Sequence, residues 1–198
     1  MNLNREQLDT LFSQRSDMRN DIHTHNFKAG MDYFINQKST TGIIVNGNIS
    51  DSRSGNYSRT PISYIPTGTV DRILVADNTN LSKRNNLNFN LNYRHADTSA
   101  RQLDINADYG IYRLRNNQVQ PNYYYDPANG SELYRVVNNM ISPTDINIYT
   151  LKVDYEQSFK KGRLGFGGKT SFITTKNNFE RYDVNNSDKT LDLSRSNF

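Results

Sequence analysis

The chain has 198 residues, of which 34% are hydrophobic and 11% aromatic, with 24 basic and 20 acidic side chains. Cysteine is absent, which excludes disulfide scaffolds, thiolate metal sites and a cysteine nucleophile. The net charge of +4 is small and the charges are interspersed, so we expect no nucleic-acid partner. A chain that is poor in bulk apolar residues but rich in aromatics, with 28 asparagines, predicts a fold that buries or covers only one face.

The first 22 residues form a polar segment, which we separate from residues 23–198. Residues 4–19 are compatible with a short helix, with Asn4 as its N-cap and Gln7 at the capping-box position. The same stretch is equally compatible with a loop or with the tail of a strand.

From residue 24 onwards, apolar and polar residues alternate with the period of two that is typical of β-strands. Six segments of about ten residues show this pattern, and such a strand crosses a hydrocarbon core when it is tilted by about 45°. Strands of ordinary globular proteins are shorter, at about five or six residues. The six segments are 25–35, 42–50, 87–94, 103–112, 149–157 and 163–172.

The connections between these segments alternate in length. Short turns are predicted at 36–40, 96–100 and 158–162, and long polar links at 50–85, 114–145 and 175–198. Short turns at one end and long loops at the other are typical of transmembrane barrels. The predicted fold is therefore all-β: an antiparallel meander of about six long strands in three hairpins, part of a larger transmembrane β-barrel. Two runs inside the long links, 69–77 and 132–140, are also compatible with strands that continue above the membrane.

The two faces of the predicted strands differ in chemistry. One face carries charged and amide side chains, which a dry core would not accept but a wet barrel lumen would. The other face is almost entirely aliphatic or aromatic, and lipid tails accept such residues at no hydrogen-bond cost. A one-sided sheet over a soluble core remains the alternative. The residues that we expect to face lipid are Leu87, Phe89, Leu91, Leu103, Ile105, Leu151 and Val153.

Few residues suggest binding chemistry, and we expect no catalytic residue, metal or cofactor. His23 and His25 have the spacing of two ligands on one strand face, but no third ligand is near them. The Asx-rich run 183–188 lacks the glycine and glutamate of a calcium loop. The long link 114–145 contains consecutive aromatics that are candidates for ligand contact, and links 50–85 and 114–145 together form the predicted ligand mouth. These aromatics are Tyr123, Tyr124 and Tyr125.

Residues 150–184 resemble the outer-membrane β-barrel family of Bacteroidetes, whose members are related to TonB-dependent receptors. The resemblance lies in a strand that ends in Asp154-Tyr155-Glu156-Gln157, the Lys-Lys-Gly turn at 160–162, and the glycine-rich strand that follows. Residues 29–43 resemble the recurrent strand–turn–strand of the same family, and the likeness extends over roughly residues 24–198.

The resemblance implies a wall segment of an outer-membrane receptor or transporter for ligand or nutrient uptake, and no enzyme. The implied location is the bacterial outer membrane. The implied partners are outer-membrane lipid, the remaining barrel strands and plug of a parent protein, and TonB in the full-length protein. Six strands are fewer than the eight of the smallest barrels, so we expect a barrel fragment. The alternative is a soluble, secreted all-β binding or adhesion module.

Overall fold

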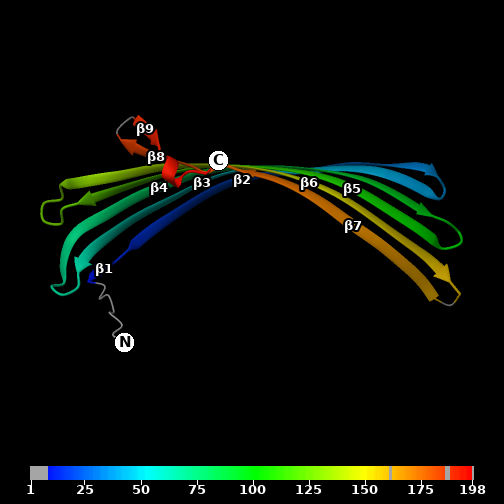
Figure 1. The fold of residues 1–198 in the computed structure, drawn as a ribbon, viewed down its shortest axis with the longest axis horizontal. Coiled ribbons are helices and arrows are strands. Elements are labelled where there is room, and N and C mark those ends of the chain that lie inside the picture. The colour runs from blue at the N-terminus through cyan, green and yellow to red at the C-terminus, as the bar shows by residue number, and fades with distance from the viewer. Residues whose placement is uncertain (1–8, 161, 186–187, 198) are drawn as a thin grey trace.

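The structure is a computed structural model and describes residues 9–160, 162–185 and 188–197. These residues form one antiparallel sheet of nine strands, drawn as an arch in Figure 1. The strands are β1 (Thr10–Phe12), β2 (Arg15–Asn36), β3 (Ser39–Tyr64), β4 (Thr69–Ala96), β5 (Arg101–Tyr125), β6 (Glu132–Phe159), β7 (Gly162–Asn177), β8 (Glu180–Asn185) and β9 (Asp188–Leu191), and a 3₁₀ turn, η1 (Leu193–Arg195), follows them.

The strands follow one another as a meander. The path runs from β1 and β2 through β3, β4, β5 and β6 to β7 and β8. The turns β2–β3, β4–β5 and β6–β7 lie at one end of the arch, and β3–β4 and β5–β6 lie at the other (Figure 1). The predicted all-β antiparallel meander is confirmed, with nine strands rather than six. Within the described residues the sheet is open, with β1 and β2 along one edge and β7 and β9 along the other.

Two of the predicted long links are wrong as loops, and the alternative that their runs 69–77 and 132–140 are strand is confirmed. Residues 50–85 are the paired halves of β3 and β4, and only residues 65–68 connect these strands. Residues 114–145 are likewise the paired halves of β5 and β6, joined by residues 126–131. Their serine, asparagine and arginine side chains are polar on both faces, so no hydropathy alternation marks them as strand. Backbone pairing with a neighbour of equal length nevertheless extends these strands to 25–28 residues. The third link, 175–198, contains the hairpin β8–β9, which stands away from the main sheet (Figure 1).

The N-terminal segment is strand in its described part, so the predicted short helix is wrong there. Strand β1 pairs with residues 62–64 of β3, and β2 pairs with β3 from Arg15 onwards. Strand β2 runs without a break across residues 22 and 23, where the sequence suggested a boundary. Cross-strand pairing overrides the weak local helix signal. Residues 4–8, including the expected N-cap, lie outside the described part of the chain.

The sheet has no enclosed hydrophobic core among the described residues. The only hydrophobic residues that are buried there are Ile62 and Ala76. Large apolar side chains stay exposed instead, for example Leu91 at 57% and Leu151 at 46%. In the ranges that the structure describes, no helix is long and apolar enough to cross a membrane. The apolar residues of the sheet are therefore available to surroundings outside the chain.

Candidate functional site

Strand register gathers the apolar residues on one face, in rows that cross the sheet. Residues directly opposite each other in an antiparallel pair point to the same side, so each row can be traced from strand to strand. Five successive rows form a surface that we call the apolar band. Its two central rows are Ala29, Val45, Phe89, Tyr109, Tyr149 and Phe172, and Met31, Ile43, Leu91, Ala107, Leu151 and Thr170.

All seven residues predicted to face lipid lie in this band. Leu87 is in the row beyond Phe89, while Ile105 and Val153 are opposite one another in the row beyond Leu91. Leu103 lies in the last row, nearest the short turns, opposite Tyr155. The sequence therefore assigned these residues to one common face of the sheet.

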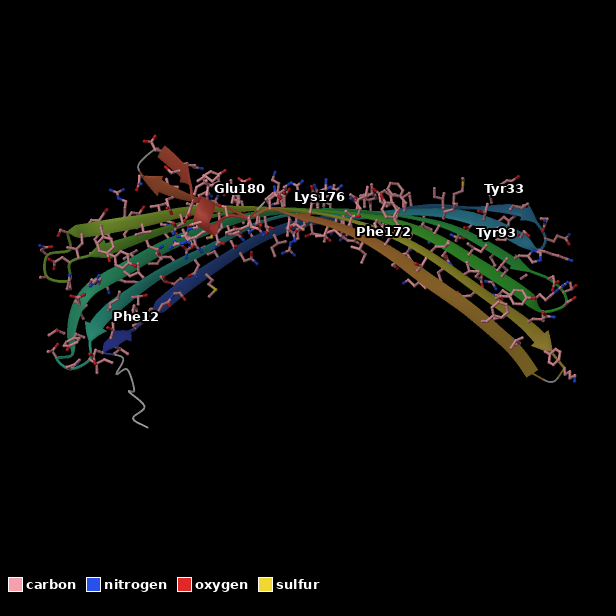
Figure 2. All side chains as sticks on the ribbon, viewed as in Figure 1. Phe12, Tyr33, Tyr93, Phe172, Lys176 and Glu180 are labelled. Carbon is pink, nitrogen blue, oxygen red and sulfur yellow. The ribbon has the colours of Figure 1, made fainter. Side chains whose placement is uncertain are left out.

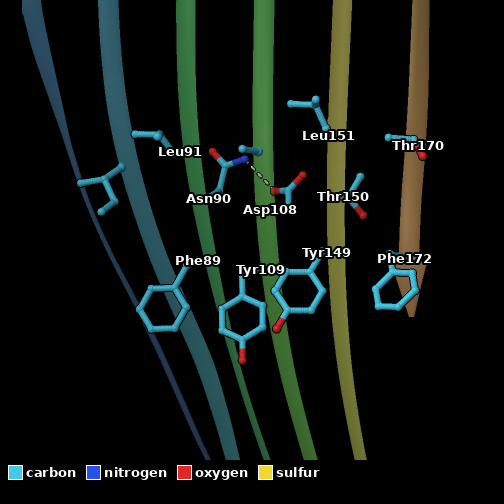
Figure 3. Close-up of a pocket in the computed structure, with 12 residues that line it drawn as sticks. Phe89, Asn90, Leu91, Asp108, Tyr109, Tyr149, Thr150, Leu151, Thr170 and Phe172 are labelled. Carbon is cyan, nitrogen blue, oxygen red and sulfur yellow. Dashed lines mark hydrogen bonds between the residues drawn. The ribbon is translucent and has the colours of Figure 1, made fainter. Parts of the chain in front are cut away.

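An aromatic ladder crosses the band. The ring centroids of Phe89 and Tyr109 are 6.3 Å apart, those of Tyr109 and Tyr149 are 4.7 Å apart, and those of Tyr149 and Phe172 are 6.4 Å apart. Figure 3 shows the four rings side by side, with Leu91 and Leu151 in the next row. Together they line a shallow groove of about 480 Å³, which is open because Ala107 lies between the two leucines.

The apolar band has limits along the strands. Five rows separate its ends by eight residues, a rise of about 26 Å along a strand. At the short-turn end the last row contains Ser39 and His95, whose Oγ and Nδ1 atoms are 2.9 Å apart. At the other end the next row on the same face contains Arg113, Asp145 and Lys176. Figure 2 shows Tyr33 and Tyr93 near the short turns, then Phe172, and then Lys176 nearer the middle of the arch.

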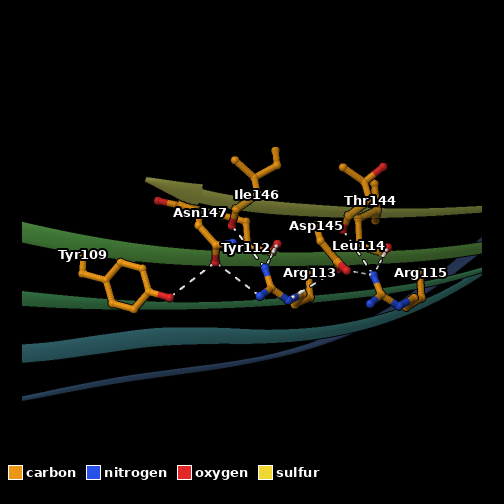
Figure 4. A network of polar contacts seen from close by, with 9 residues as sticks. All are labelled: Tyr109, Tyr112, Arg113, Leu114, Arg115, Thr144, Asp145, Ile146 and Asn147. Carbon is orange, nitrogen blue, oxygen red and sulfur yellow. Dashed lines mark hydrogen bonds and ion pairs between the residues drawn. The ribbon is translucent and has the colours of Figure 1, made fainter. Parts of the chain in front are cut away.

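A network of polar contacts, which we call the arginine network, begins where the band ends (Figure 4). The Tyr109 hydroxyl donates to Oδ1 of Asn147 at 3.4 Å, and Arg113 Nη2 donates to the same oxygen at 3.3 Å. Oδ1 of Asp145 lies 3.4 Å from Arg113 Nε and 2.6 Å from Arg115 Nη1. The hydrogen bond from Arg115 lowers the pKa of Asp145, and the charges of both arginines act in the same direction. Asp145 therefore stays ionised and orients both guanidinium groups.

The opposite face is mainly polar along the length of the band, with Phe34, Ile44, Ile148 and Ile173 as apolar exceptions. Amide side chains bridge neighbouring strands there: Asn88 donates to Asn46 at 3.2 Å and Asn90 to Asp108 at 2.6 Å. The carboxylates that the sequence placed on one face are on this side and have polar partners. Asp104 accepts from Gln102, Asp108 from Asn90, Asp154 pairs with Lys152, and Glu156 pairs with Arg163.

The same polar face forms a basin farther from the short turns. Its volume is about 690 Å³, and its lining is mainly serine and asparagine, with residues from β2, β3, β4 and β5. The side-chain oxygens of Asn56, Asn78 and Asn80 are buried there without a hydrogen-bond partner in the described structure. We did not find this basin from the sequence, because its residues lie in segments that we predicted as loops. The signal was the alternation of Ser50, Ser52 and Ser54.

The three tyrosines proposed for ligand contact are not in a loop. They form the end of β5 and pair with both β4 and β6. Tyr124 stacks on Tyr134 of β6 with ring centroids 4.4 Å apart. The ring centroids of Tyr123 and Tyr125 are 6.5 Å apart. The Cζ atom of Arg135 lies over the Tyr123 ring, 6.0 Å from its centroid. The loop placement is wrong because cross-strand aromatic pairs hold this segment in the sheet.

The candidate metal ligands do not meet. His23 and His25 lie opposite Asp51 and Ile49 in the pairing of β2 with β3. No group of three histidine, aspartate or glutamate side chains suited to a metal occurs within residues 9–160, 162–185 and 188–197. The calcium-like run is divided between β8 and β9, with residues 186–187 outside the described part.

An antiparallel sheet with one apolar band and one polar face is the architecture of a membrane-barrel wall. Residues 94–198, which are 105 of the 198 residues, match the model of the outer membrane protein beta-barrel family. The chain belongs to this family, and membership indicates a location in the bacterial outer membrane. No curated protein matches the chain.

Proposed function

We propose that the chain forms part of the wall of an outer-membrane receptor or transporter that resembles TonB-dependent receptors and takes up a ligand or nutrient. Its role is to bind and conduct rather than to catalyse. The observation that carries the proposal is the separation of chemistry between the two faces of the sheet, one of which carries the apolar band while the other is mainly polar. In β4, for example, Phe89 and Leu91 belong to the apolar band, while Asn90 lies on the polar face.

In this proposal the apolar band contacts lipid. Its side chains are exposed in the sheet, and no second layer of the described structure covers them. A rise of about 26 Å corresponds to a height of about 18–21 Å at a strand tilt of about 35–45°, somewhat less than the roughly 25 Å band of outer-membrane barrels. Tyr33, Tyr93 and Tyr155 near the short turns then occupy the membrane interface, where amphipathic rings are favourable.

The polar face then lines the ligand route. Its amide and carboxylate groups hydrogen bond to one another across strands, as expected for a surface that also contacts water. The basin of serine and asparagine lies on the same face, and its unpaired amide oxygens offer acceptors to the hydroxyl or amino groups of a ligand. Further barrel strands and TonB are the partners that this function requires.

Cysteine labelling tests the assignment of the two faces, because the chain has no native cysteine. Single substitutions Leu91→Cys and Leu151→Cys are compared with the neighbouring Asn92→Cys and Lys152→Cys in outer membranes. A water-soluble maleimide is expected to label the second pair and to leave the first pair unlabelled. Equal labelling of neighbouring positions would contradict the proposal.

Energised uptake needs a separate test. Photocrosslinking of the full-length protein in cells is expected to give an adduct with TonB. Correct labelling of the two faces together with no TonB adduct would retain the barrel wall and refute the TonB-dependent part of the proposal.

A further inference from the structure

The groove in the apolar band and the arginine network are parts of one continuous surface. Tyr109 belongs to both, because its ring lines the groove and its hydroxyl donates to Asn147. Asn147, which lies opposite Ile111, in turn accepts from Arg113, so the surface changes from aliphatic to cationic over the four rows from Ala107 to Arg113 of β5, with the Tyr109 hydroxyl between them. Such a surface is complementary to an amphiphile with an apolar tail and an anionic head.

Beyond the groove, cationic side chains outnumber carboxylates. Arg113, Arg115 and Lys176 surround the single carboxylate of Asp145, and each lowers the pKa of that group. In the next row Lys83 lies directly opposite Arg115. Asp51 lies opposite Lys83 on its other side, so the two rows together hold four cations and two carboxylates.

The arginines are positioned to donate further hydrogen bonds. Arg115 Nη1 donates to the carbonyl oxygens of Leu114 and Thr144 as well as to Asp145, which fixes the plane of the guanidinium. In the described structure its Nε and Nη2 make no hydrogen bond to another residue, and the side chain is 49% exposed. A planar guanidinium with unoccupied donors is well suited to a phosphate, which it can bind through two oxygens.

The distance from the groove to the cations fits a lipid. Arg113 lies six residues beyond Ala107, which is in the middle row of the band. Six residues rise about 20 Å along a strand, or about 15 Å along the membrane normal at a tilt near 45°. This is half of a hydrocarbon core of about 30 Å. A groove centred in the bilayer thus places the cations at the level of the lipid headgroups.

We propose that this surface binds a phosphate-bearing membrane lipid, with an acyl chain in the groove between Leu91 and Leu151 and the phosphate over Arg113, Arg115 and Lys176. The inference rests on the proposed function, because it requires the apolar band to face the bilayer. It goes beyond that function in assigning a specific lipid class to one site on the outer wall.

Lipid selectivity tests the proposal. The full-length protein is reconstituted in phosphatidylcholine vesicles, and electron paramagnetic resonance compares the motional restriction of spin-labelled phosphatidic acid and spin-labelled phosphatidylcholine. We expect a preference of at least about fivefold for phosphatidic acid, since one basic residue near a membrane surface contributes about that factor. The preference is also expected to fall as the salt concentration rises.

Matched variants locate the effect. Arg115→Gln/Lys176→Gln is expected to reduce the preference to near that of phosphatidylcholine. The control Arg84→Gln/Lys169→Gln removes the same charge from the opposite face and is expected to retain the preference. Ala107→Phe fills the groove and is expected to weaken binding of phosphatidic acid without loss of charge. If the double variant at the network fails to fold, the salt dependence of the unaltered chain and the groove variant still decide the outcome.

Each remaining outcome has a distinct meaning. Inorganic phosphate at matched ionic strength is expected to compete poorly with the lipid. If it displaces phosphatidic acid completely and Ala107→Phe has no effect, the site binds free phosphate and the lipid proposal is overturned. If the cysteine variants show the expected labelling but phosphatidic acid is not preferred, this inference fails alone. If the labelling itself does not alternate, the proposed function fails first.

Discussion

Arginine substitutions along β5 provide a quantitative test of which face meets lipid. This strand carries Ala107 in the middle row of the apolar band, with Asn106 and Asp108 on the polar face. Replacement of Ala107 by arginine places a charge in the centre of the proposed lipid contact. The same replacement of Asn106 places it on the polar face one residue away, with nearly the same position along the strand.

The expected loss of stability depends on the depth of the substituted arginine in the bilayer. An arginine on the lipid face of a barrel costs about 2–4 kcal/mol at the bilayer midplane and about 0–1 kcal/mol near the interfaces. Ala107→Arg should therefore lower the free energy of unfolding by about 2–4 kcal/mol. The cost should decrease towards Leu103 and Ile111, which lie in the two end rows. Asn106→Arg should change stability by less than about 1 kcal/mol, because the side chain stays in water.

Urea titration of the full-length protein folded in lipid vesicles measures these differences, and far-UV circular dichroism reports folding. Equal costs at Ala107 and Asn106, or a cost that does not vary with depth, would refute the assignment of the faces. A chain that remains folded and monomeric in buffer without detergent or lipid would refute it independently.

Three further predictions concern local features. Ala100 has a positive φ of 54° in the β4–β5 turn, so Ala100→Gly should stabilise the protein by up to about 1 kcal/mol in the same titration. A Cβ atom added at Gly47 would contact the ring of Phe27, so Gly47→Ala should cost about 1–3 kcal/mol, and a double-mutant cycle with Phe27→Ala should show strong coupling. A backbone hydrogen bond from Arg101 lowers the pKa of Asp97, and the Arg101 side chain acts in the same direction. The contribution of Asp97 to stability is therefore present above its unfolded pKa of about 3.9 and is lost as the pH falls through the lower folded value. The protection factors of the turn amides, after correction for the pH dependence of intrinsic exchange, should fall in acid, and Asp97→Asn should remove this pH dependence.

The sequence predicted the segments of β2 to β7 in which the two faces of the strand differ in polarity. Phe89 and Asn90 are informative neighbours. Removal from water is favourable for the phenylalanine and unfavourable for the asparagine, so their alternation indicates the strand period. The outer halves of β3 and β4 carry no such signal. Ser54 and Asn80 face each other there, and both faces are polar, so hydropathy does not distinguish a strand from a loop. Only pairing with a neighbour of equal length defines these residues as strand.

The arginine network was missed for a different reason. Arg113 and Asp145 are 32 residues apart, and only the register of β5 against β6 brings them together. A signal was nevertheless present, because Asp126 and Gly130 are typical turn residues and Gly130 has a φ of 72°. A tight hairpin centred near residue 128 would have placed Arg113 opposite Asp145 and Tyr109 opposite Tyr149. The prediction of a long link at residues 114–145 left these residues unpaired, so the contact of Arg113 with Asp145 was not predicted.

The edges of the sheet connect the apolar band to the need for further strands. The band reaches both edge strands, with Phe27 and Met31 in β2 and Phe172 in β7. If the band lies in hydrocarbon, both edges lie there as well, and the outward backbone groups of β2 and β7 have no partner among the described residues. Unsatisfied backbone groups cost several kcal/mol each in lipid, whereas a closed barrel satisfies all of them. A lipid-facing band on this sheet therefore requires additional strands along both β2 and β7, and an isolated sheet would pair with copies of itself through the same edges.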